Sequence, residues 1–506
     1  MDNEGIKQIL VDFLQRGLVI SPWLMMNSES RFDASLFMVV DRMATEMVDL
    51  YWTEEEKIKT YQDVPLSERV PKTSVYEIIA STALSIAHYK FGELEVYYDQ
   101  VAEARALLND FIADYGFGSV LILYGLVTSF ENAQVLYYYG KVPEKVFNMG
   151  SWHRPWVDYT LSDELFWGIF SGNYQIEILD NMRYVTLTDK GQQVYLENLQ
   201  LLDECGYLTR RVRQLQIHNF SFYQNYSEVA NEFWPNMMQL RKDFLSWSGV
   251  QTGMRILELG CANGISTFDS GLAALVGENG KVVAIDPSMG MVYRANKRKV
   301  ELNAHWVTIV QAAAERLPFE STSFDAVVAY NSLHFMDLSV ALQEVMRVLR
   351  PGGFFASIHP LKFNMAENLL VQEWMEPITR LAKTRVGGNQ KNQEPIDNQK
   401  SSVEIHAAFA DAGYQDIEQA FPKTVNFFKD SETIVNHVIR GVGWMQEELS
   451  MVPWKAREDI IQEVFDLGNS LCEKYSVEDR IFLSPMQMIK GTKSTTIQIH
   501  PQEADG

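Results

Sequence analysis

A small-residue turn next to an acidic side chain is the part of this sequence best suited to chemistry. Residues 255–264 read Arg-Ile-Leu-Glu-Leu-Gly-Cys-Ala-Asn-Gly, an apolar stretch that ends in Gly260 and Gly264. Glycine lets the backbone turn sharply and approach a ligand closely. Glu258, near the end of the stretch, can place a carboxylate beside a cation or hydroxyl of that ligand. The turn alone is weak evidence for a site, because a plain strand-to-helix connection has the same pattern.

A second acid strengthens this interpretation. Asp286 ends the apolar stretch 281–286, and an acid about 20 residues after such a turn can accept hydrogen bonds from both hydroxyls of a ribose. The alternative role for Asp286 is to cap a helix that begins near Ser288, and the two roles are compatible. We therefore predict a nucleoside-binding site at the ends of two neighbouring strands.

The elements that must position these residues follow in a regular order. A helix is predicted from Ile265, directly after the glycine turn, and segment 349–353 combines a helix stop with a turn. Alternating strands and helices predict a doubly wound α/β sheet, in which ligands bind outside the carboxyl ends of the strands. The predicted strands are 255–259, 281–286, 307–312, 323–330, 354–358, 417–421 and 481–490, with a helix at 403–412.

Several motifs in this order resemble the class I S-adenosylmethionine-dependent methyltransferases, in the small-molecule group that includes the ubiquinone/menaquinone-type enzymes. They are Glu258-x-Gly260-x-Ala262-x-Gly264, Asp286, Glu315-x-Leu317-Pro318-Phe319, Ser323-Phe324-Asp325, Leu333-His334 and Leu349-x-Pro351-Gly352-Gly353. The similarity covers residues 226–493, just over half of the chain. It implies a seven-stranded Rossmann-like domain and S-adenosyl-L-methionine as cofactor, and it says almost nothing about the methyl acceptor.

The resemblance also assigns roles to single residues. Gly260, Ala262 and Gly264 would line the amino acid end of the cofactor, with Ala262 where the family usually has glycine. Glu258 would lie near the amino or ribose groups, and Asp286 would bind the ribose diol. The full set of predicted cofactor residues is Tyr226, Glu258, Gly260, Cys261, Ala262, Gly264, Asp286, Pro287, Ala313, Ala314, Glu315 and Asn331. Of these, Cys261 is interpreted as a small packing residue rather than a nucleophile.

One position departs from the family pattern. The family commonly has aspartate at the position of Ala313, where the carboxylate accepts a hydrogen bond from the adenine amine. Losing one charged hydrogen bond costs roughly 1.5–3 kcal/mol. Backbone groups of the loop, or Glu315, are the alternative partners for adenine.

Methyl transfer makes modest demands on acid–base chemistry. The transfer is in-line, so proximity and alignment are the main contributions of the enzyme. A general base is needed only when the acceptor must lose a proton. His334, after the fourth strand, is the candidate base, although the matching histidine of the family is often structural. No cluster of cysteine and histidine has the spacing of a metal site, so no metal is predicted.

Composition limits the remaining possibilities. A chain of 506 residues has room for about two to four domains. Its net charge of −22 repels phosphate backbones, which disfavours a nucleic-acid partner. The acidic start lacks the charge pattern of a signal peptide, and the apolar run 120–127 is too short and interrupted to span a bilayer. These features predict a cytoplasmic enzyme.

The N-terminal half, residues 1–217, has apolar positions at helical spacing and is predicted to be mostly helical. A turn at 180–183, a β-rich run and a helix at 192–205 capped by Thr188 resemble the end of a winged-helix domain. In the family, such domains serve dimerisation and closure of the substrate pocket, so a homodimer is expected. A DNA-binding winged helix is the rival interpretation. The aromatic segment 150–159 is interpreted as packing, with a substrate-facing loop as the alternative.

The junction at 218–234 precedes the first strand, where the family has a lid over the cofactor. Tyr223 and Tyr226 would then cover the sulfonium, because an aromatic ring attracts a positive centre. The alternative is an amphipathic helix packed on the sheet. The predicted domains are 1–217, then 218–496 with helical cap insertions at 361–402 and 430–480, and a tail at 497–506.

The sequence as a whole predicts an S-adenosylmethionine-dependent methyltransferase. Its acceptor is expected to be a small or carrier-bound metabolite, with O-methylation slightly ahead of C- or N-methylation. Two other classes stay open: a non-catalytic cofactor-binding or interaction protein, which Ala313 keeps in consideration, and a winged-helix DNA-binding regulator.

Overall fold

The computed structural model describes most of the C-terminal half of the chain and parts of the N-terminal half. The described residues are 3–16, 109–148, 162–208, 220, 223, 226–362, 368–374, 400–442, 449 and 454–495. The predictions for the helical stretches between 17 and 108, for segment 150–159 and for the tail 497–506 fall outside these residues. Two compact units form: Met1–Asn219 with Pro377–Gln393 and Trp444–Gln462, and Phe220–Glu376 with Glu394–Gly443 and Glu463–Gly506.

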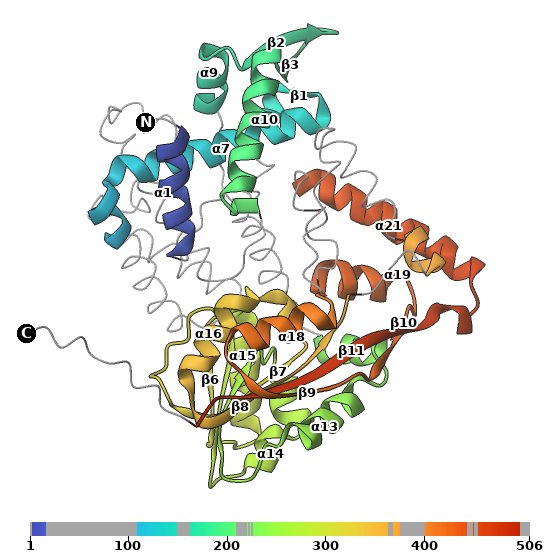
Figure 1. The fold of residues 1–506 in the computed structure, drawn as a ribbon. Helices are drawn as coiled ribbons and strands as arrows, with labels where there is room; N and C mark the ends of the chain where they lie inside the picture. The colour runs from blue at the N-terminus through green and yellow to red at the C-terminus, as the bar shows by residue number, and fades with distance from the viewer. Residues whose placement is uncertain are drawn as a thin grey trace, which may run out of the picture. The chain divides into compact units, whose positions relative to one another are not determined.

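The first unit contains helices and a small antiparallel sheet with the strand order β1-β3-β2. Its described elements are α1 (Asn3–Gln15), α7 (Phe117–Tyr139), β1 (Lys141–Pro143), α8 (Glu144–Asn148), α9 (Ser162–Phe170), β2 (Tyr174–Leu179), β3 (Met182–Leu187) and α10 (Asp189–Glu204) (Figure 1). The predicted turn joins β2 to β3 through Asp180 and Asn181, both with positive φ. Thr188 caps α10 by accepting a hydrogen bond from the Gly191 N–H at 3.0 Å, as predicted.

Helix α7 is one continuous helix from Phe117 to Tyr139. By length and composition alone it is the one helix of the described residues that could cross a membrane, and 73% of its most apolar window is buried in the structure. Phe130 of α7 stacks on Tyr195 of α10 with ring centroids 5.5 Å apart. Both rings are buried, so this pair belongs to the core of the first unit.

The second unit is built on a mixed sheet with the order β10-β11-β8-β7-β4-β5-β6, and β9 also pairs with β11. The strands are β4 (Arg255–Leu259), β5 (Lys281–Asp286), β6 (Val307–Gln311), β7 (Phe324–Tyr330), β8 (Leu349–Pro360), β9 (Gln415–Ala420), β10 (Lys423–Phe427) and β11 (Ile481–Thr492). The strands from β6 to β8 are parallel, and β11 is antiparallel to β8. The parallel arrangement predicted from the sequence is therefore confirmed.

Three details of the prediction were wrong. The sheet has eight strands instead of seven, because Lys423–Phe427 forms an extra strand against residues 481–485 of the long β11. Segment 349–353, predicted as a turn, belongs to β8, although its pairing with β7 is irregular. The expected helix from Ile265 is broken into a π-helix, η2 (Ile265–Asp269), and α14 (Leu272–Val276), because Gly271 adopts a left-handed conformation between them.

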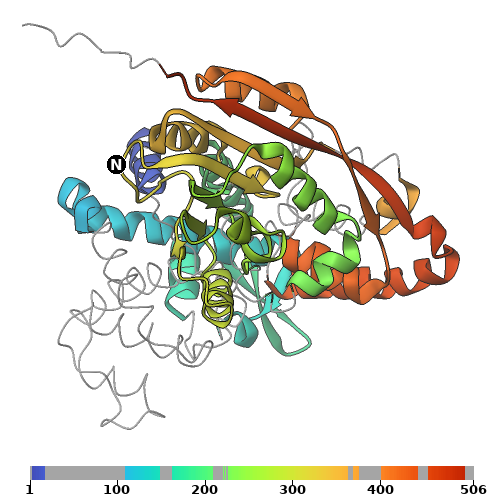
Figure 2. The same ribbon diagram turned by 90° about the horizontal axis from the view of Figure 1, so that it is seen from below.

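Helices cover both faces of the sheet, as Figures 1 and 2 show. Phe244 of α13 (Met237–Ser248), Val276 of α14 and Ala295 of α15 (Met289–Glu301) belong to the core on one face. Leu342 of α16 (Leu338–Val348) and Phe409 of α18 (Ser402–Asp411) belong to the core on the other face. The sheet is therefore doubly wound, and its strand ends are held between two packed layers.

The remaining described helices follow the strands or precede the sheet. They are α12 (Tyr226–Phe233), η3 (Leu333–Phe335), α19 (Ser431–Thr433), the π-helix η6 (Ile434–Val442), α21 (Trp454–Lys474) and η7 (Glu478–Arg480). Of the predicted cap insertions, the parts within 368–374, 400–402, 430–442, 449 and 454–480 are described, and those within 430–442 and 454–480 are largely helical.

Candidate functional site

The acid at the end of β5 is joined directly to the glycine turn after β4. Oδ2 of Asp286 accepts a hydrogen bond from the Ala262 N–H at 2.9 Å, and Oδ1 accepts from the Ser288 N–H at 2.8 Å. The helix cap of α15 is Ser288, whose hydroxyl accepts from the Met291 N–H, so the alternative role of Asp286 as that cap is wrong. Asp286 instead orders the turn and keeps lone pairs on both oxygens for a ligand's hydroxyl groups.

The turn itself depends on unusual backbone angles. Gly260, Ala262 and Gly264 all have positive φ, at 69°, 49° and 83°. A Cβ atom on Gly260 would lie 2.5 Å from the Cβ of Ser332, whose hydroxyl donates to the Leu259 carbonyl at 2.9 Å. Glycine is therefore required at 260 both for its φ and for space. Ala262 carries a left-handed conformation that costs an L-residue roughly 1–2 kcal/mol.

Two carboxyl groups of the site are buried and have raised pKa values. Glu258 on β4 is fully buried; its Oε2 accepts from the Thr267 hydroxyl at 2.6 Å, while Oε1 has no hydrogen-bond partner among the described residues. Burial raises the pKa of Glu258 to about 7. Burial also raises the pKa of Asp286 to about 6, against the stabilising backbone N–H groups of Ser288 and Ala262.

Cys261 and Pro287 flank these acids. The Cys261 N–H donates to the Ile285 carbonyl at 2.9 Å, and burial raises the pKa of its thiol well above the usual value. A buried, neutral thiol agrees with the interpretation of Cys261 as a packing residue. The carbonyl of Pro287 accepts from Nε2 of Gln311 at 2.9 Å, which ties the start of α15 to the end of β6.

The predicted adenine loop follows β6. Ala313 is exposed and Ala314 is buried, so the loop has no polar side chain at these two positions. The Ala313 carbonyl accepts from the Arg316 N–H at 3.2 Å. Oε1 of Glu315 accepts from the Asp337 N–H at 2.8 Å, which holds the loop after β6 against the segment after β7. Backbone groups of Ala313 and Ala314 are thus what the loop itself offers to adenine.

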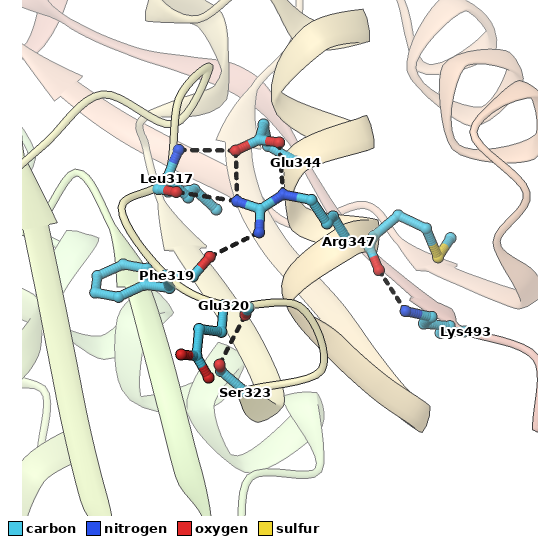
Figure 3. Close-up of polar contacts among 8 residues, drawn as sticks. Leu317, Phe319, Glu320, Ser323, Glu344, Arg347 and Lys493 are labelled. Atoms are coloured by element: carbon cyan, nitrogen blue, oxygen red, sulfur yellow. Dashed lines mark hydrogen bonds and ion pairs between the residues drawn. The ribbon is translucent and has the colours of Figure 1, made fainter.

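Figure 3 shows how α16 fixes the continuation of this loop. Arg347 and Glu344 form a two-point ion pair at 2.8 Å. The guanidinium also donates to the carbonyls of Leu317 and Phe319 at 2.9 and 2.6 Å, and Glu344 accepts from the Leu317 N–H at 2.8 Å. The Glu-x-Leu-Pro-Phe motif is therefore held by a charge-assisted network, which positions the loop before it.

The segment before β4 agrees with the second interpretation made from the sequence, a helix packed on the sheet, and its role as a lid over the cofactor stays a prediction. Tyr223 and Tyr226 are buried and pack with Ile265 and Met291, as a helix packed on the sheet would. Ser227 on α12 and the side chain of Asn263 exchange hydrogen bonds at 2.8 and 3.2 Å, which places α12 over the glycine turn. Helix α12 therefore contacts the glycine turn at Asn263, and Ala262 of the same turn packs against the cluster that contains Tyr223 and Tyr226.

At the carboxyl end of β7, Asn331 and His334 stand where the resemblance placed them. Asn331 has positive φ, its amide donates to the sulfur of Met237, and its Oδ1 is buried without a partner among the described residues. Nδ1 of His334, on η3, is also buried and makes no hydrogen bond within the described part of the chain. Burial and the nearby His359 lower the pKa of His334 to about 3, so its imidazole is neutral at physiological pH.

At the sequence level Arg241 was missed, and His437 was only a weaker candidate base whose pairing with Tyr223 was not foreseen. Arg241 on α13 is 1% exposed, and its charge interacts with Tyr226 and Glu258. It could have been found as a charged residue on the apolar face that Met237, Leu240 and Phe244 form at helical spacing. His437 in η6 receives or donates a hydrogen bond at 2.6 Å with the Tyr223 hydroxyl, and nothing in its sequence context signals that pairing.

The residues present fit the cofactor that the resemblance implies. Oε1 of Glu258 and Oδ1 of Asn331 are buried acceptors that receive no hydrogen bond from any residue that the structure describes, so they need a donor. The carboxylate of Asp286 can accept from ribose hydroxyls while it holds the turn. Acceptors of this kind match the ammonium and hydroxyl groups of S-adenosyl-L-methionine.

Comparison with known proteins agrees with this geometry. Residues 257–357 match the family described as "Methyltransferase domain". Similar curated proteins include the demethylmenaquinone methyltransferases of Oceanobacillus iheyensis, 33% identical over 22% of this chain and 47% of the relative, and of Lactococcus lactis, 40% identical over 21% and 41%. A ubiquinone/menaquinone biosynthesis C-methyltransferase of Pseudomonas savastanoi is 34% identical over 29% and 52%.

The chain spans about half the length of these relatives. Among solved structures, the YcgJ protein of Bacillus subtilis is 18% identical, with a TM-score of 0.34 over 51% of this chain and 99% of the other. The matched segment contains Glu258, the glycine turn, Asp286 and His334. This chain therefore contains, over residues 257–357, a class I S-adenosylmethionine-dependent methyltransferase domain.

Proposed function

We propose that this protein is an S-adenosylmethionine-dependent methyltransferase that acts on a small or carrier-bound metabolite. The observation that carries the proposal is the 2.9 Å hydrogen bond between Asp286 and the Ala262 N–H within the matched segment. That bond joins the predicted ribose acceptor to the turn predicted to line the amino acid end of the cofactor. The names of the similar proteins refer to demethylmenaquinone and to ubiquinone/menaquinone biosynthesis, which favours a small-molecule acceptor.

When bound, S-adenosyl-L-methionine supplies an electrophilic methyl group on a sulfonium. The residues of this chain would bind and align that group: Asp286 would accept from the ribose, Glu258 would accept from the amino acid end, and α12 would exclude water. Alignment of the reacting atoms is the largest contribution available to such a site. His334, which is neutral and has an unbonded Nδ1, is the group we assign to take a proton from an acceptor that must lose one.

For the acceptor atom we place oxygen ahead of nitrogen, because N-terminal domains of this kind occur in O-methyltransferases. Carbon is the second candidate, since one relative is named a C-methyltransferase. Reaction with methyl-¹³C-labelled cofactor and a low-molecular-weight metabolite extract would separate them, because O-, N- and C-methyl carbons have distinct chemical shifts in NMR. A label found only on material retained by a filter would indicate a carrier-bound acceptor.

The first unit supports an assembly role in this proposal. The order of α7, β1, α8, α9, β2 and β3 supports the proposal of a winged helix, in which α9 would take the place of the helix that enters the DNA groove in a DNA-binding member. The sequence of α9, Ser-Asp-Glu-Leu-Phe-Trp-Gly-Ile-Phe, has no lysine or arginine. Phe166, Trp167 and Phe170 on it are exposed. This surface suits a protein partner, such as a second copy in a cytoplasmic homodimer, better than DNA.

Sedimentation of the full chain tests the assembly. We expect a dimer that Phe170→Glu weakens, with Glu197→Lys on the exposed side of α10 as a control for surface charge. A monomer at all concentrations would contradict the homodimer. A mobility shift of duplex DNA that weakens steeply with salt would instead support the DNA-binding regulator.

Turnover distinguishes the proposed methyltransferase from a non-catalytic cofactor-binding or interaction protein. An interaction protein with this fold would bind S-adenosylmethionine without releasing S-adenosylhomocysteine in the presence of any acceptor extract. The proposal predicts extract-dependent release of S-adenosylhomocysteine, measured by mass spectrometry, that His334→Ala reduces if the acceptor must lose a proton.

A further inference from the structure

His437 of η6 is a buried histidine with one of its two ring nitrogens unused. Nδ1 lies 2.6 Å from the hydroxyl of Tyr223, whereas Nε2 makes no hydrogen bond within the described part of the chain. The side chain has a relative exposure of 0%. Buried polar atoms nearly always have a hydrogen-bond partner, so an unused one at this depth calls for an explanation.

The bond to Tyr223 determines which nitrogen of the imidazole carries the proton. Burial lowers the pKa of His437 to about 3 and raises the pKa of Tyr223 above its usual value, so both groups are neutral near pH 7. Among the described residues, Nδ1 is the acceptor that the structure provides for the hydrogen of the Tyr223 hydroxyl. A neutral imidazole that accepts at Nδ1 has its proton on Nε2. Nε2 is therefore a buried donor that needs an acceptor.

The rings that contact the imidazole are uncharged. The ring centroids of Phe233 and Trp234 lie 5.0 and 4.8 Å from that of the imidazole, and the ring of Tyr226 lies 6.5 Å away. A carboxylate brought to Nε2 would lose its hydration without an opposite charge in contact. An ammonium group has donors only and cannot accept from Nε2. The acceptor that suits Nε2 is therefore a neutral oxygen, as in a hydroxyl or carbonyl group.

His437 borders the predicted cofactor site through the segment before β4. The ring of Tyr223 packs 5.6 Å from that of Tyr226, and Ala262 of the glycine turn packs against the cluster that contains both tyrosines. The negative charge of Asp286 raises the pKa of the Tyr226 phenol, in addition to the larger effect of burial. The imidazole is thus separated by these two rings from the residues predicted to bind S-adenosylmethionine.

A second set of contacts connects His437 to the carboxyl end of β7. Trp234, which packs on the imidazole, accepts a hydrogen bond at its carbonyl from the Met237 N–H at 2.9 Å. The sulfur of Met237 accepts from the amide of Asn331 at 3.1 Å. Segment 234–237 is therefore in contact with both η6 and the residue that follows β7. In a doubly wound sheet, ligands bind outside the carboxyl ends of the strands, which places His437 beside that region.

We propose that His437, oriented by Tyr223, binds the methyl acceptor, with Nε2 donating a hydrogen bond to a neutral hydroxyl or carbonyl oxygen of that molecule. The inference rests on the proposed function and adds the class of acceptor, a neutral oxygen-bearing compound rather than a carboxylate or an amine. Tyr223 is a positioning residue, because it acts through the imidazole. His437 orients the acceptor and takes no proton from it, since Nε2 already carries one.

Two amide substitutions at position 437 separate the roles of the two ring nitrogens. The amide of asparagine reaches the position of Nδ1, and that of glutamine, one methylene longer, reaches the position of Nε2. Release of S-adenosylhomocysteine by the full chain is measured against dilutions of the acceptor extract at saturating S-adenosylmethionine. His437→Asn should raise the extract concentration that gives the half-maximal rate by roughly 5- to 150-fold, the range for one lost hydrogen bond. His437→Gln should raise it less.

A histidine with only a structural role would give the reverse order, because asparagine keeps the bond to Tyr223 and glutamine loses it. For the same reason His437→Asn should bind S-adenosylmethionine in calorimetry as well as the parent does. The matched control is His305→Asn, an exposed position between α15 and β6, which should change neither quantity. Tyr223→Phe should also raise the half-maximal extract concentration, since the imidazole proton is then no longer confined to Nε2.

Nuclear magnetic resonance of the full chain labelled with ¹⁵N-histidine tests the hydrogen bond without turnover. Protonated and bare ring nitrogens have distinct chemical shifts, and the signals of His437 are those that His437→Asn lacks. Acetophenone, a neutral ring with one carbonyl oxygen, should move the Nε2 signal in the presence of S-adenosylhomocysteine. Benzylamine, a cation of similar size near pH 7, should leave it unmoved. The signals of His305 should stay fixed with both probes.

The outcomes separate this inference from the proposed function. If His437→Asn is at least as active as His437→Gln at limiting extract, or if acetophenone leaves Nε2 unmoved, His437 does not bind the acceptor, although turnover by the parent would still support the methyltransferase. A bare Nε2 in the parent would contradict the donor role. If no extract supports release of S-adenosylhomocysteine by the parent, the proposed function fails, and the response of Nε2 to acetophenone still decides whether His437 binds a neutral oxygen.

Discussion

The hydroxyl of Tyr223 lies 2.6 Å from Nδ1 of His437, and both side chains are buried. This bond links the lid segment before α12 to the π-helix η6, which are 214 positions apart in the chain. Phe233 and Trp234 pack their rings 5.0 and 4.8 Å from the imidazole. Burial lowers the pKa of His437 to about 3, so the imidazole is neutral. The hydrogen bond between the two side chains therefore joins neutral groups, and it fixes the segment before α12 to η6.

Removing the Tyr223 hydroxyl should loosen this lid. In Tyr223→Phe, Nδ1 of His437 is left buried without a partner, which costs roughly 1–3 kcal/mol. Hydrogen–deuterium exchange should become faster in α12 and η6. The control is Tyr414→Phe, a buried tyrosine whose hydroxyl makes only a long bond of 3.4 Å to the Leu342 carbonyl. Equal exchange at α12 in both variants would show that the pair does not hold the lid.

Cofactor binding should release protons in mildly acidic solution. The raised pKa values of Asp286 (about 6) and Glu258 (about 7) mean that both carboxyls are partly protonated in the free protein near pH 6. The ligand's hydroxyl and ammonium groups need the ionised forms, so affinity should rise with pH between 5 and 8, by at least about tenfold. Calorimetry in buffers of different ionisation enthalpy counts the protons released.

The raised pKa values of Asp286 and Glu258 have the opposite effect on folding: they make the stability of the free protein fall, not rise, as the pH increases. Because the folded-state pKa values are raised, these two carboxyls stabilise the free protein at low pH, and that contribution is lost as pH rises through about 6 to 7. Asp286→Asn should reduce the number of protons released on binding. An affinity for S-adenosylhomocysteine that is flat from pH 5 to 8 would contradict the assigned roles of both acids.

A side chain at Gly260 should weaken cofactor binding in addition to straining the backbone. In Gly260→Ala the new Cβ would lie 2.5 Å from Ser332 in addition to the positive φ. Gly413→Ala is the matched control, because Gly413 also has positive φ and nothing within 4 Å of its Cβ position. Both variants lose about 1–2 kcal/mol to backbone strain. Only Gly260→Ala should also weaken S-adenosylhomocysteine, by tenfold or more in calorimetry.

Ala262→Gly should stabilise the protein. Alanine holds a left-handed conformation there, which costs about 1–2 kcal/mol, while glycine adds about 0.4–1 kcal/mol of unfolded-state entropy. The expected net gain is up to about 1 kcal/mol, measured as a shift of the urea midpoint. Ala410→Gly, at an exposed position inside α18, has only the entropic cost and should shift the midpoint the other way. A loss at both positions would mean that Ala262 is not strained.

The parallel sheet could be predicted because its strands are buried on both faces and therefore appear as apolar runs, as in residues 281–286 and 324–330. The extra strand β10, Lys-Thr-Val-Asn-Phe, could not, since it has only five residues, three of them polar, and is defined by its pairing with β11. The break between η2 and α14 could not be predicted either, because it depends on the left-handed conformation of the single residue Gly271.

The same distinction separates the site residues that could be predicted from those that could not. Glu258, Gly260 and Asp286 were predictable because they lie in sequence next to the strands that position them. Arg241 and His437 reach the site from other elements through side-chain packing, which sequence spacing alone does not specify. The alternative cap role for Asp286 failed because Ser288, two residues later, forms the actual cap.

The central claim is that Asp286 and the glycine turn form a site for the nucleoside of S-adenosylmethionine. Calorimetry of the full chain with S-adenosylhomocysteine tests it most directly, with Asp286→Ala as the site variant and Asp411→Ala, an exposed acid at the end of α18, as the control. We predict micromolar or tighter binding by the parent and the control, and a loss of at least about tenfold in Asp286→Ala. No binding by the parent, or equal binding by all three proteins, would contradict the account.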